Sequence, residues 1–138
     1  MRPWTEKVYG ISPTQIIGSN IRLRYEIRNG SPVLVRLPAI ELFDEGVEKP
    51  VAIHHFIGKK PIFAFGDSDG DLPMLLWVAS GAGSRFTGLV HHTDSERAHE
   101  IHLPIGRSDH VLAEAQARGW TVVDMKEDWK DVFPPATS

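Results

Sequence analysis

The chain has 138 residues, enough for one domain with a hydrophobic core, and its composition of 41% hydrophobic and 24% charged residues is that of an ordinary globular protein. The net charge of −3 gives no electrostatic basis for binding nucleic acid or an anionic membrane. No segment reaches the roughly 20 apolar residues of a membrane-spanning helix, and the absence of cysteine excludes disulfides and thiolate chemistry. Because the N-terminus has no apolar signal core, we expect the chain as given to be cytoplasmic, although a longer parent protein could be exported.

The first part of the chain predicts a short helix followed by a β-hairpin. Residues 3–9 have the character of the last turns of a helix. Apolar and polar residues alternate over 22–27 and 32–37, and Asn29-Gly30 between them is a strong signal for a hairpin turn. The sequence therefore predicts an antiparallel hairpin over residues 20–38.

The segment between the hairpin and residue 60 carries weaker signals. Residues 38–49 are acidic and mixed, which favours a loop. Residues 51–57 predict a short helix that turns Val51, Ile53 and Phe56 or Ile57 inward.

Strands and helices alternate in the second half. The continuous apolar run 61–65 is typical of a parallel strand covered on both faces, and 86–91 and 120–124 predict two more strands. Helices are predicted over 72–79, with Leu72, Leu75, Leu76 and Ala79 inward, and from a Ser108 cap to Gly119, with Val111, Leu112 and Ala115 inward. A short closing helix is predicted around Trp129, Val132 and Phe133. The pattern predicts one α/β domain over residues 1–138, a parallel sheet flanked by helices with the hairpin near its N-terminus.

An acidic turn follows the strand predicted over 61–65. Asp67, Asp69 and Asp71 place three carboxylates within a few residues, and such a cluster is costly unless a cation holds it. Mg²⁺ is commonly bound by one or two carboxylates together with waters and a substrate phosphate. Ligands also bind beyond the carboxyl ends of strands in open α/β sheets. The turn is therefore a candidate Mg²⁺ site.

Three other interpretations of this turn stay open. Asp71 before Leu72-Pro73 has the position of a helix N-cap, although capping leaves Asp67 and Asp69 unexplained. An EF-hand loop would need Gly and Glu where Leu72 and Val78 stand. Asp67 and Asp69 also have the spacing of the nucleophile and acid/base pair of aspartate-based phosphatases, but Asp71 stands where Thr or Val is usual.

The segment 66–75, with the sequence GDSDGDLPML, resembles the fourth motif of the haloacid dehalogenase-like (HAD) superfamily, in its phosphoserine-phosphatase-like branch. The resemblance extends to most of the chain, through residues 8–13, 57–61, 89–94 and 119–125. It implies a Rossmann-like parallel sheet and a Mg²⁺-dependent phosphomonoester phosphatase. It further implies that Asp67 and Asp71 are metal ligands and that an upstream lysine contacts the phosphoryl group. Lys49 is the best match for that lysine, with Lys59 and Lys60 as runners-up; a solvated loop lysine is the alternative.

Two motifs of the family are absent from these residues. No Asp-x-Asp-x-Thr segment precedes residue 60, and no strand ends in Ser or Thr before a Gly-rich turn. The chain thus resembles the C-terminal half of such an enzyme, and we expect it to be inactive alone. The alternative is a non-catalytic α/β module that depends on a partner.

The missing first strand of the family has a structural consequence. Strand 61–65 would normally pair with it, so we expect an open apolar edge that recruits a second copy or an N-terminal-half partner. At the end of the next strand, His91, His92 and Asp94 could approach the same crevice. Hydrogen bonding by these histidines is favoured over metal ligation, which stays the alternative.

Overall fold

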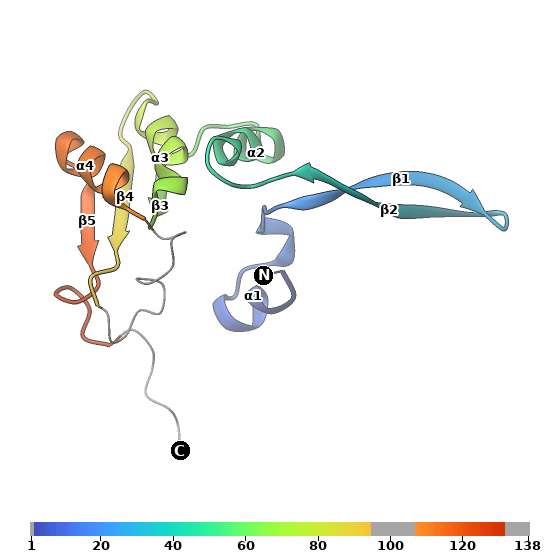
Figure 1. Ribbon diagram of the computed structural model, residues 1–138, viewed down its shortest axis with the longest axis horizontal. Helices are drawn as coiled ribbons and strands as arrows, with labels where there is room; N and C mark the ends of the chain where they lie inside the picture. Colours follow the sequence, from blue (N-terminus) through green and yellow to red (C-terminus); the bar gives the residue numbers. More distant parts are fainter. Residues whose placement is uncertain (1, 95–106, 132–138) are drawn as a thin grey trace, which may run out of the picture. The chain divides into compact units, whose positions relative to one another are not determined.

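The computed structural model describes residues 2–94 and 107–131 and divides into two compact units, Met1–Gly58 and Lys59–Ser138. The chain is mixed α/β, with a two-stranded antiparallel sheet in the first unit and a three-stranded parallel sheet in the second (Figure 1). None of the helices in these described ranges has the length and apolar character needed to cross a bilayer.

The first unit contains helix α1 (Arg2–Tyr9), a short 3₁₀ turn η1 (Pro13–Gln15), strands β1 (Asn20–Arg28) and β2 (Ser31–Leu42), and helix α2 (Glu48–Ile57). The prediction of α1 is confirmed. Helix α2 begins three residues earlier than predicted and ends at Gly58, whose φ of 69° provides a left-handed C-cap. The predicted inward face is wrong, because Ala52 is fully buried whereas Val51, Phe56 and Ile57 are exposed.

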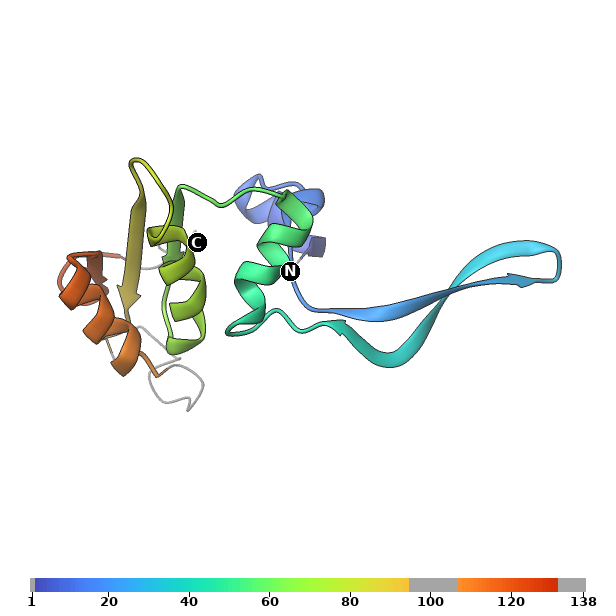
Figure 2. The same cartoon turned by 90° about the horizontal axis from the view of Figure 1, so that it is seen from above.

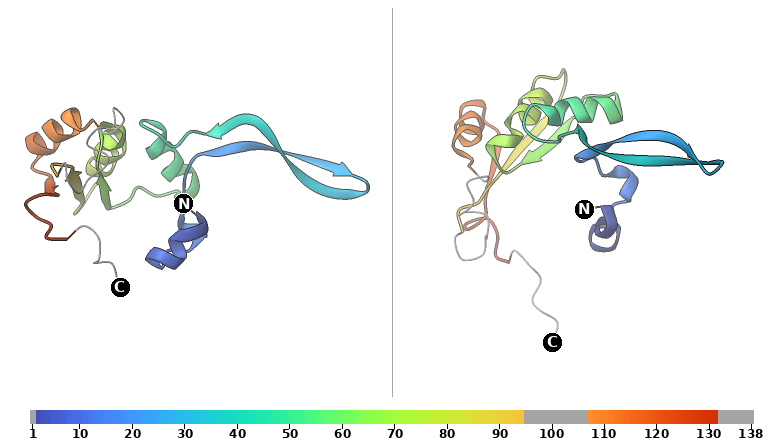
Figure 3. Two further views of the ribbon diagram at one scale, coloured as in Figure 1. Left: turned by 60° about the horizontal axis from the view of Figure 1, so that its bottom comes forward. Right: turned by 45° about the vertical axis from the view of Figure 1, so that its right-hand side comes forward.

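The hairpin of β1 and β2 forms around the turn that the sequence indicates. Asn29 and Gly30 both have positive φ, 51° and 77°, which is the conformation that tight hairpin turns require. The register then runs from Arg28 opposite Ser31 toward Asn20 opposite Leu42. The two strands coil about each other along the hairpin (Figure 3), as twisted two-stranded ribbons do.

Strand β2 extends beyond the predicted range, so the loop predicted over 38–49 is wrong in its first part. The loop was predicted from the acidic, mixed composition of 38–49, but β2 continues through Pro38, which lacks a backbone N–H. The register shifts between Ile21 and Leu23, which pair with Ile40 and Arg36, and Pro38 lies opposite this irregularity. An edge strand tolerates proline where the ladder is already interrupted.

The second unit has the predicted alternation. Strands β3 (Phe63–Gly66), β4 (Phe86–His91) and β5 (Thr121–Asp124) are parallel in the order β3-β4-β5, and helices α3 (Leu72–Ala79) and α4 (Asp109–Arg118) connect them in the chain. Both helices lie on the same face of this sheet (Figure 2). Its core is one cluster of buried residues, Ala64, Leu75, Val78, Leu89, Val111 and Ala115. The predicted range of α4 is confirmed, with Val111 and Ala115 buried and Gly119 at its end. Helix α3 buries Leu75 and Val78 rather than Leu76 and Ala79.

The opposite face of β3 differs from the prediction of a strand covered on both faces. Phe63 and Phe65 are 57% and 40% exposed, whereas Ala64 between them is buried. Their rings pack with Phe86 of β4, at centroid distances of 5.1 Å from Phe63 and 5.5 Å from Phe65. The ring of Phe65 also covers Gly88, where an added Cβ would lie 2.2 Å from it. This face is therefore an aromatic surface, and β3 is an edge strand of the described sheet.

The chain after β5 does not form the predicted closing helix in its described part. Residues 125–128 form turns, and Trp129 is not helical. Val132 and Phe133, the other residues of that prediction, lie outside the described residues.

Candidate functional site

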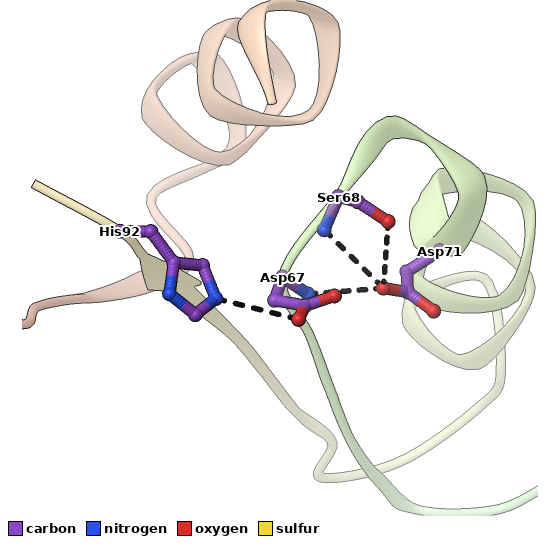
Figure 4. Close-up of polar contacts among 4 residues, drawn as sticks. All are labelled: Asp67, Ser68, Asp71 and His92. Atoms are coloured by element: carbon purple, nitrogen blue, oxygen red, sulfur yellow. Dashed lines mark hydrogen bonds and ion pairs between the residues drawn. The ribbon is translucent and has the colours of Figure 1, made fainter. Parts of the chain in front are cut away.

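The acidic turn lies at the carboxyl end of β3, where the strand passes through a 3₁₀ turn η2 (Asp69–Asp71) into α3. The carboxylate of Asp71 folds back over this turn and accepts hydrogen bonds from the backbone N–H groups of Asp67 at 3.0 Å and Ser68 at 3.3 Å. The hydroxyl of Ser68 donates to the same oxygen at 3.3 Å (Figure 4). Asp71 is 6% exposed, and an added Cβ on Gly66 would lie 2.4 Å from its Cβ. Glycine at position 66 thus lets the buried carboxylate close the turn.

Asp69 does not line the hollow that Asp67 and Asp71 share, and it has its own partners. Its Oδ1 accepts a hydrogen bond of 2.8 Å from the N–H of Val111 in the first turn of α4. Its own N–H donates to the carbonyl of Arg107 at 2.7 Å. Asp69 therefore caps α4 from a distant part of the chain, and a carboxylate there also complements the positive end of the helix dipole.

This arrangement corrects two capping predictions. Neither Asp71 at the start of α3 nor Ser108 at the start of α4 makes a side-chain capping hydrogen bond. It also contradicts the EF-hand interpretation, because that loop needs its alternate carboxylates to converge on one ion and Asp69 is bound to a helix end.

Asp67 lies between Asp71 and a histidine of the neighbouring strand. His92 Nε2 is 3.3 Å from Asp67 Oδ2, with His92 22% and Asp67 46% exposed at the side chain (Figure 4). Partial burial raises the pKa of Asp67, and the adjacent Asp71 carboxylate raises it further, while His92 opposes both effects. A carboxyl whose negative charge is disfavoured in this way is one that a cation would stabilise.

Asp67, Asp71 and His92 line one open hollow of about 340 Å³ together with Phe65, Gly66 and Val90. Its lining comes from the carboxyl ends of β3 and β4 and from the turn that follows β3. Two of the three predicted carboxylates thus share a pocket. Within residues 2–94 and 107–131, however, no group of three or more histidine or acidic side chains is placed to hold a metal ion.

The candidate lysines lie elsewhere. Lys49 is in the first turn of α2, in the first unit, so the geometry of the hollow does not include it and its phosphate-binding role stays a prediction. Lys60 precedes β3 at the end away from the acids, where its Nζ donates to Ser80 Oγ at 2.9 Å and lies 5.3 Å from the ring centre of Trp77. That contact gives Lys60 a structural role at the opposite end of the strand.

His92 is the site residue whose position beside Asp67 the sequence analysis missed. The prediction of a hydrogen-bonding histidine is confirmed for His92, but its partner, Asp67, was not foreseen. Asp67 and His92 are each the first residue after adjacent parallel strands, β3 and β4. Because such ends meet at one edge of the sheet, this shared position was the available signal.

Comparisons with known proteins add no family assignment. The search of protein-family models and the search of curated proteins both find no match to this chain. The resemblance of residues 66–75 to the HAD superfamily therefore stays an expectation from the sequence.

Proposed function

We propose that residues 1–138 form the C-terminal part of a HAD-type, Mg²⁺-dependent phosphomonoester phosphatase with a Rossmann-like core. Asp67 is the proposed metal ligand, Asp71 a direct ligand or the group that positions Asp67, and Lys49 the phosphate contact. The observation that carries the proposal is the shared hollow at the carboxyl end of β3, where Asp67 and Asp71 meet after a strand-to-helix turn. The motif resemblance of residues 66–75 supports the same assignment.

The two carboxylates would have different roles in this site. Asp67 is half-exposed at the hollow, so its free lone pairs can reach an ion. Asp71 is buried and holds the backbone of Asp67 and Ser68 through their N–H groups, so it fixes the direction of the Asp67 side chain. Bound Mg²⁺ would supply positive charge that offsets the phosphoryl oxygens. His92 would have to release Asp67 or share it with the ion.

The nucleophile is the part that these residues do not supply. Without an Asp-x-Asp-x-Thr strand, the aspartyl-phosphate route has no carboxylate to attack phosphorus. We propose that this strand comes from polypeptide outside residues 1–138 and pairs with the open edge of β3. An N-terminal-half partner or a homo-oligomer could provide that pairing, and a phosphorylated small molecule is the proposed substrate class.

Calorimetry with Mg²⁺, followed by inorganic phosphate, tests the proposed site. We expect binding by the native chain and its loss in Asp67→Asn. Asp109→Asn, the same change at an exposed acid of α4, is the matched control and should leave binding intact. No hydrolysis of p-nitrophenyl phosphate is expected from the chain alone. Hydrolysis that needs Mg²⁺ and Asp67 would show that the expectation of inactivity is wrong.

A specific observation favours the second candidate, a non-catalytic α/β module. Each acid of the turn already has a protein partner: Asp67 contacts His92, Asp69 caps α4 and Asp71 binds backbone N–H groups. These contacts can stabilise the turn without an ion. The module predicts no binding of Mg²⁺ or phosphate in the calorimetric experiment, so that one measurement separates the two functions.

A further inference from the structure

The hairpin of the first unit has one strongly apolar face. Because directly paired residues of an antiparallel ladder lie on the same side, the register defines this face. Its members are Ile21, Leu23, Tyr25 and Ile27 of β1 and Pro32, Leu34, Arg36 and Ile40 of β2. Tyr25 and Leu34 pair directly and are 64% and 66% exposed. Large apolar side chains thus line most of the length of the hairpin on one side.

The other face of the hairpin combines charged residues of β1 with Val33, Val35 and Leu37 of β2, which are partly buried there. Glu26 lies between Arg24 and Arg28 and accepts from their Nε atoms at 2.7 and 2.9 Å, and these hydrogen bonds lower the pKa of its carboxyl. Arg22 and Glu41 form a further exposed ion pair at 2.8 Å. The apolar residues beside these ion pairs are thus already partly covered, whereas those of the opposite face are exposed.

The apolar face has the size of a dimer interface. An isolated two-stranded hairpin is marginal in water, because it cannot bury an apolar face on its own. The six large apolar residues of the face are between 43% and 66% exposed. Covering them completely in two copies would remove at most roughly 1,400 Å² from water, and stable protein interfaces bury about 1,200–2,000 Å². An apolar patch of that size is larger than the isolated apolar residues of an ordinary surface.

We propose that this face packs against the same face of a second copy, sheet on sheet, about a two-fold axis near the Tyr25–Leu34 pair. Face-to-face packing fits the chain better than extension of the ladder, because Pro32 and Pro38 interrupt the free edge of β2 and pairing along the edge of β1 would leave the apolar face uncovered. Arg36 is the charge on this face, opposite Leu23. Arg36 lies one pair from this axis, so in the dimer its aliphatic stem would contact the partner while its guanidinium extends to solvent. This dimer is independent of the proposed phosphatase site.

Sedimentation velocity over a range of protein concentrations tests the dimer. We expect the native chain to dimerise, Leu34→Asp to be monomeric at every concentration, and Ser31→Asp to dimerise as the native chain does. Ser31 pairs with Arg28 on the charged face, so it receives the same charge without touching the proposed interface. A monomeric native chain, or equal behaviour of the two variants, would overturn the proposal. So would a dimer that survives Leu34→Asp and is lost in Phe63→Lys, because Phe63 lies on the sheet of the second unit.

Thiol labelling gives a readout that does not depend on a disruptive charge. Because the chain contains no cysteine, Tyr25→Cys and Arg24→Cys each carry a single thiol, on the apolar and charged faces respectively. We expect the maleimide reactivity of Tyr25→Cys to fall as the protein concentration rises, and that of Arg24→Cys to stay constant. Protection of the Tyr25→Cys thiol that is independent of concentration would mean that the same chain covers the face, and would contradict the dimer.

Discussion

The two β-structures of this protein bury apolar residues in different ways. The hairpin has strands of 9 and 12 residues, yet every residue in them is exposed or partly exposed. The sheet of the second unit includes strands of only 4 residues, β3 and β5, yet helices α3 and α4 cover one of its faces and bury Ala64 and Leu89 completely or nearly so. The comparison teaches that strand length and hydrogen-bond number do not make a core. A second layer packed against the sheet does.

The largest expected effect comes from removing a core side chain on the helix-covered face. Leu75 is fully buried in the second unit, so Leu75→Ala should lower the unfolding free energy by about 3 kcal/mol. Leu34→Ala in the hairpin is the matched change, and at concentrations where the chain is monomeric its cost should be smaller because Leu34 is 66% exposed within one copy. Urea denaturation of both variants measures the difference. Equal losses would mean that the hairpin face is as well buried as the core.

The sequence predicted which segments form helices and strands better than it predicted which faces of the strands are buried. Regular spacing of Val111, Leu112 and Ala115 identified α4, and alternation over 22–27 identified β1, because both patterns follow from local backbone geometry. The apolar run 61–65 indicated a strand but not which faces are covered, since Phe63 and Phe65 are as apolar as a core residue. Whether a strand face is buried depends on tertiary packing, which the apolar run alone does not specify.

For the candidate site, the sequence indicated the two acids that share the hollow but not the contacts that each acid makes. Asp67 and Asp71 were identified from three acids after an apolar strand, and they do share a hollow. The sequence did not predict that Asp69 has a different partner from Asp67 and Asp71, because Asp69 binds an N–H that lies 42 residues away in the chain. The contact between Asp67 and His92 also depends on the pairing of two strands rather than on local spacing.

A smaller effect is expected from the contact that joins the acidic turn to the helical layer. Asp69→Ala removes the acceptor for the N–H of Val111, so it should lower the unfolding free energy by about 1 kcal/mol. Ser108→Ala should cost less, because Ser108 makes no capping hydrogen bond. Thermal unfolding of the two variants ranks them. The reverse ranking would restore Ser108 as the cap of α4.

A pH-dependent effect is expected at the carboxyl end of the sheet. The Thr93 hydroxyl donates to Asp124, and with the N–H groups of Glu127 and Lys126 it holds the pKa of that carboxyl below its ordinary value. A depressed carboxyl pKa stabilises the fold above the unfolded-state value of about 4, and the contribution disappears as pH falls through the folded-state value. The stability difference between the native chain and Thr93→Val should therefore shrink below about pH 4 in pH-dependent denaturation. A difference that is unchanged at low pH would exclude the Asp124 carboxylate as its source.

The smallest effect on stability is expected at the uncovered aromatic face of the sheet. Phe63 is 57% exposed, so Phe63→Lys should change the unfolding free energy little while it reduces any association through the β3 edge. Light scattering at high protein concentration measures that association, and Lys7→Arg, far from this sheet in sequence, serves as a neutral control. A strongly destabilised Phe63→Lys variant would mean that this face is covered in the folded chain.

The hydrogen bond from Val111 to Asp69 also has a consequence for the order of folding. A bond between residues 42 positions apart forms only after the intervening segment, including β4, has been brought back to the sheet. The local bonds from Asp67 and Ser68 to Asp71 need no such distant partner. A peptide covering residues 59–80 should therefore lack only the part of the turn that Asp69 fixes through Val111.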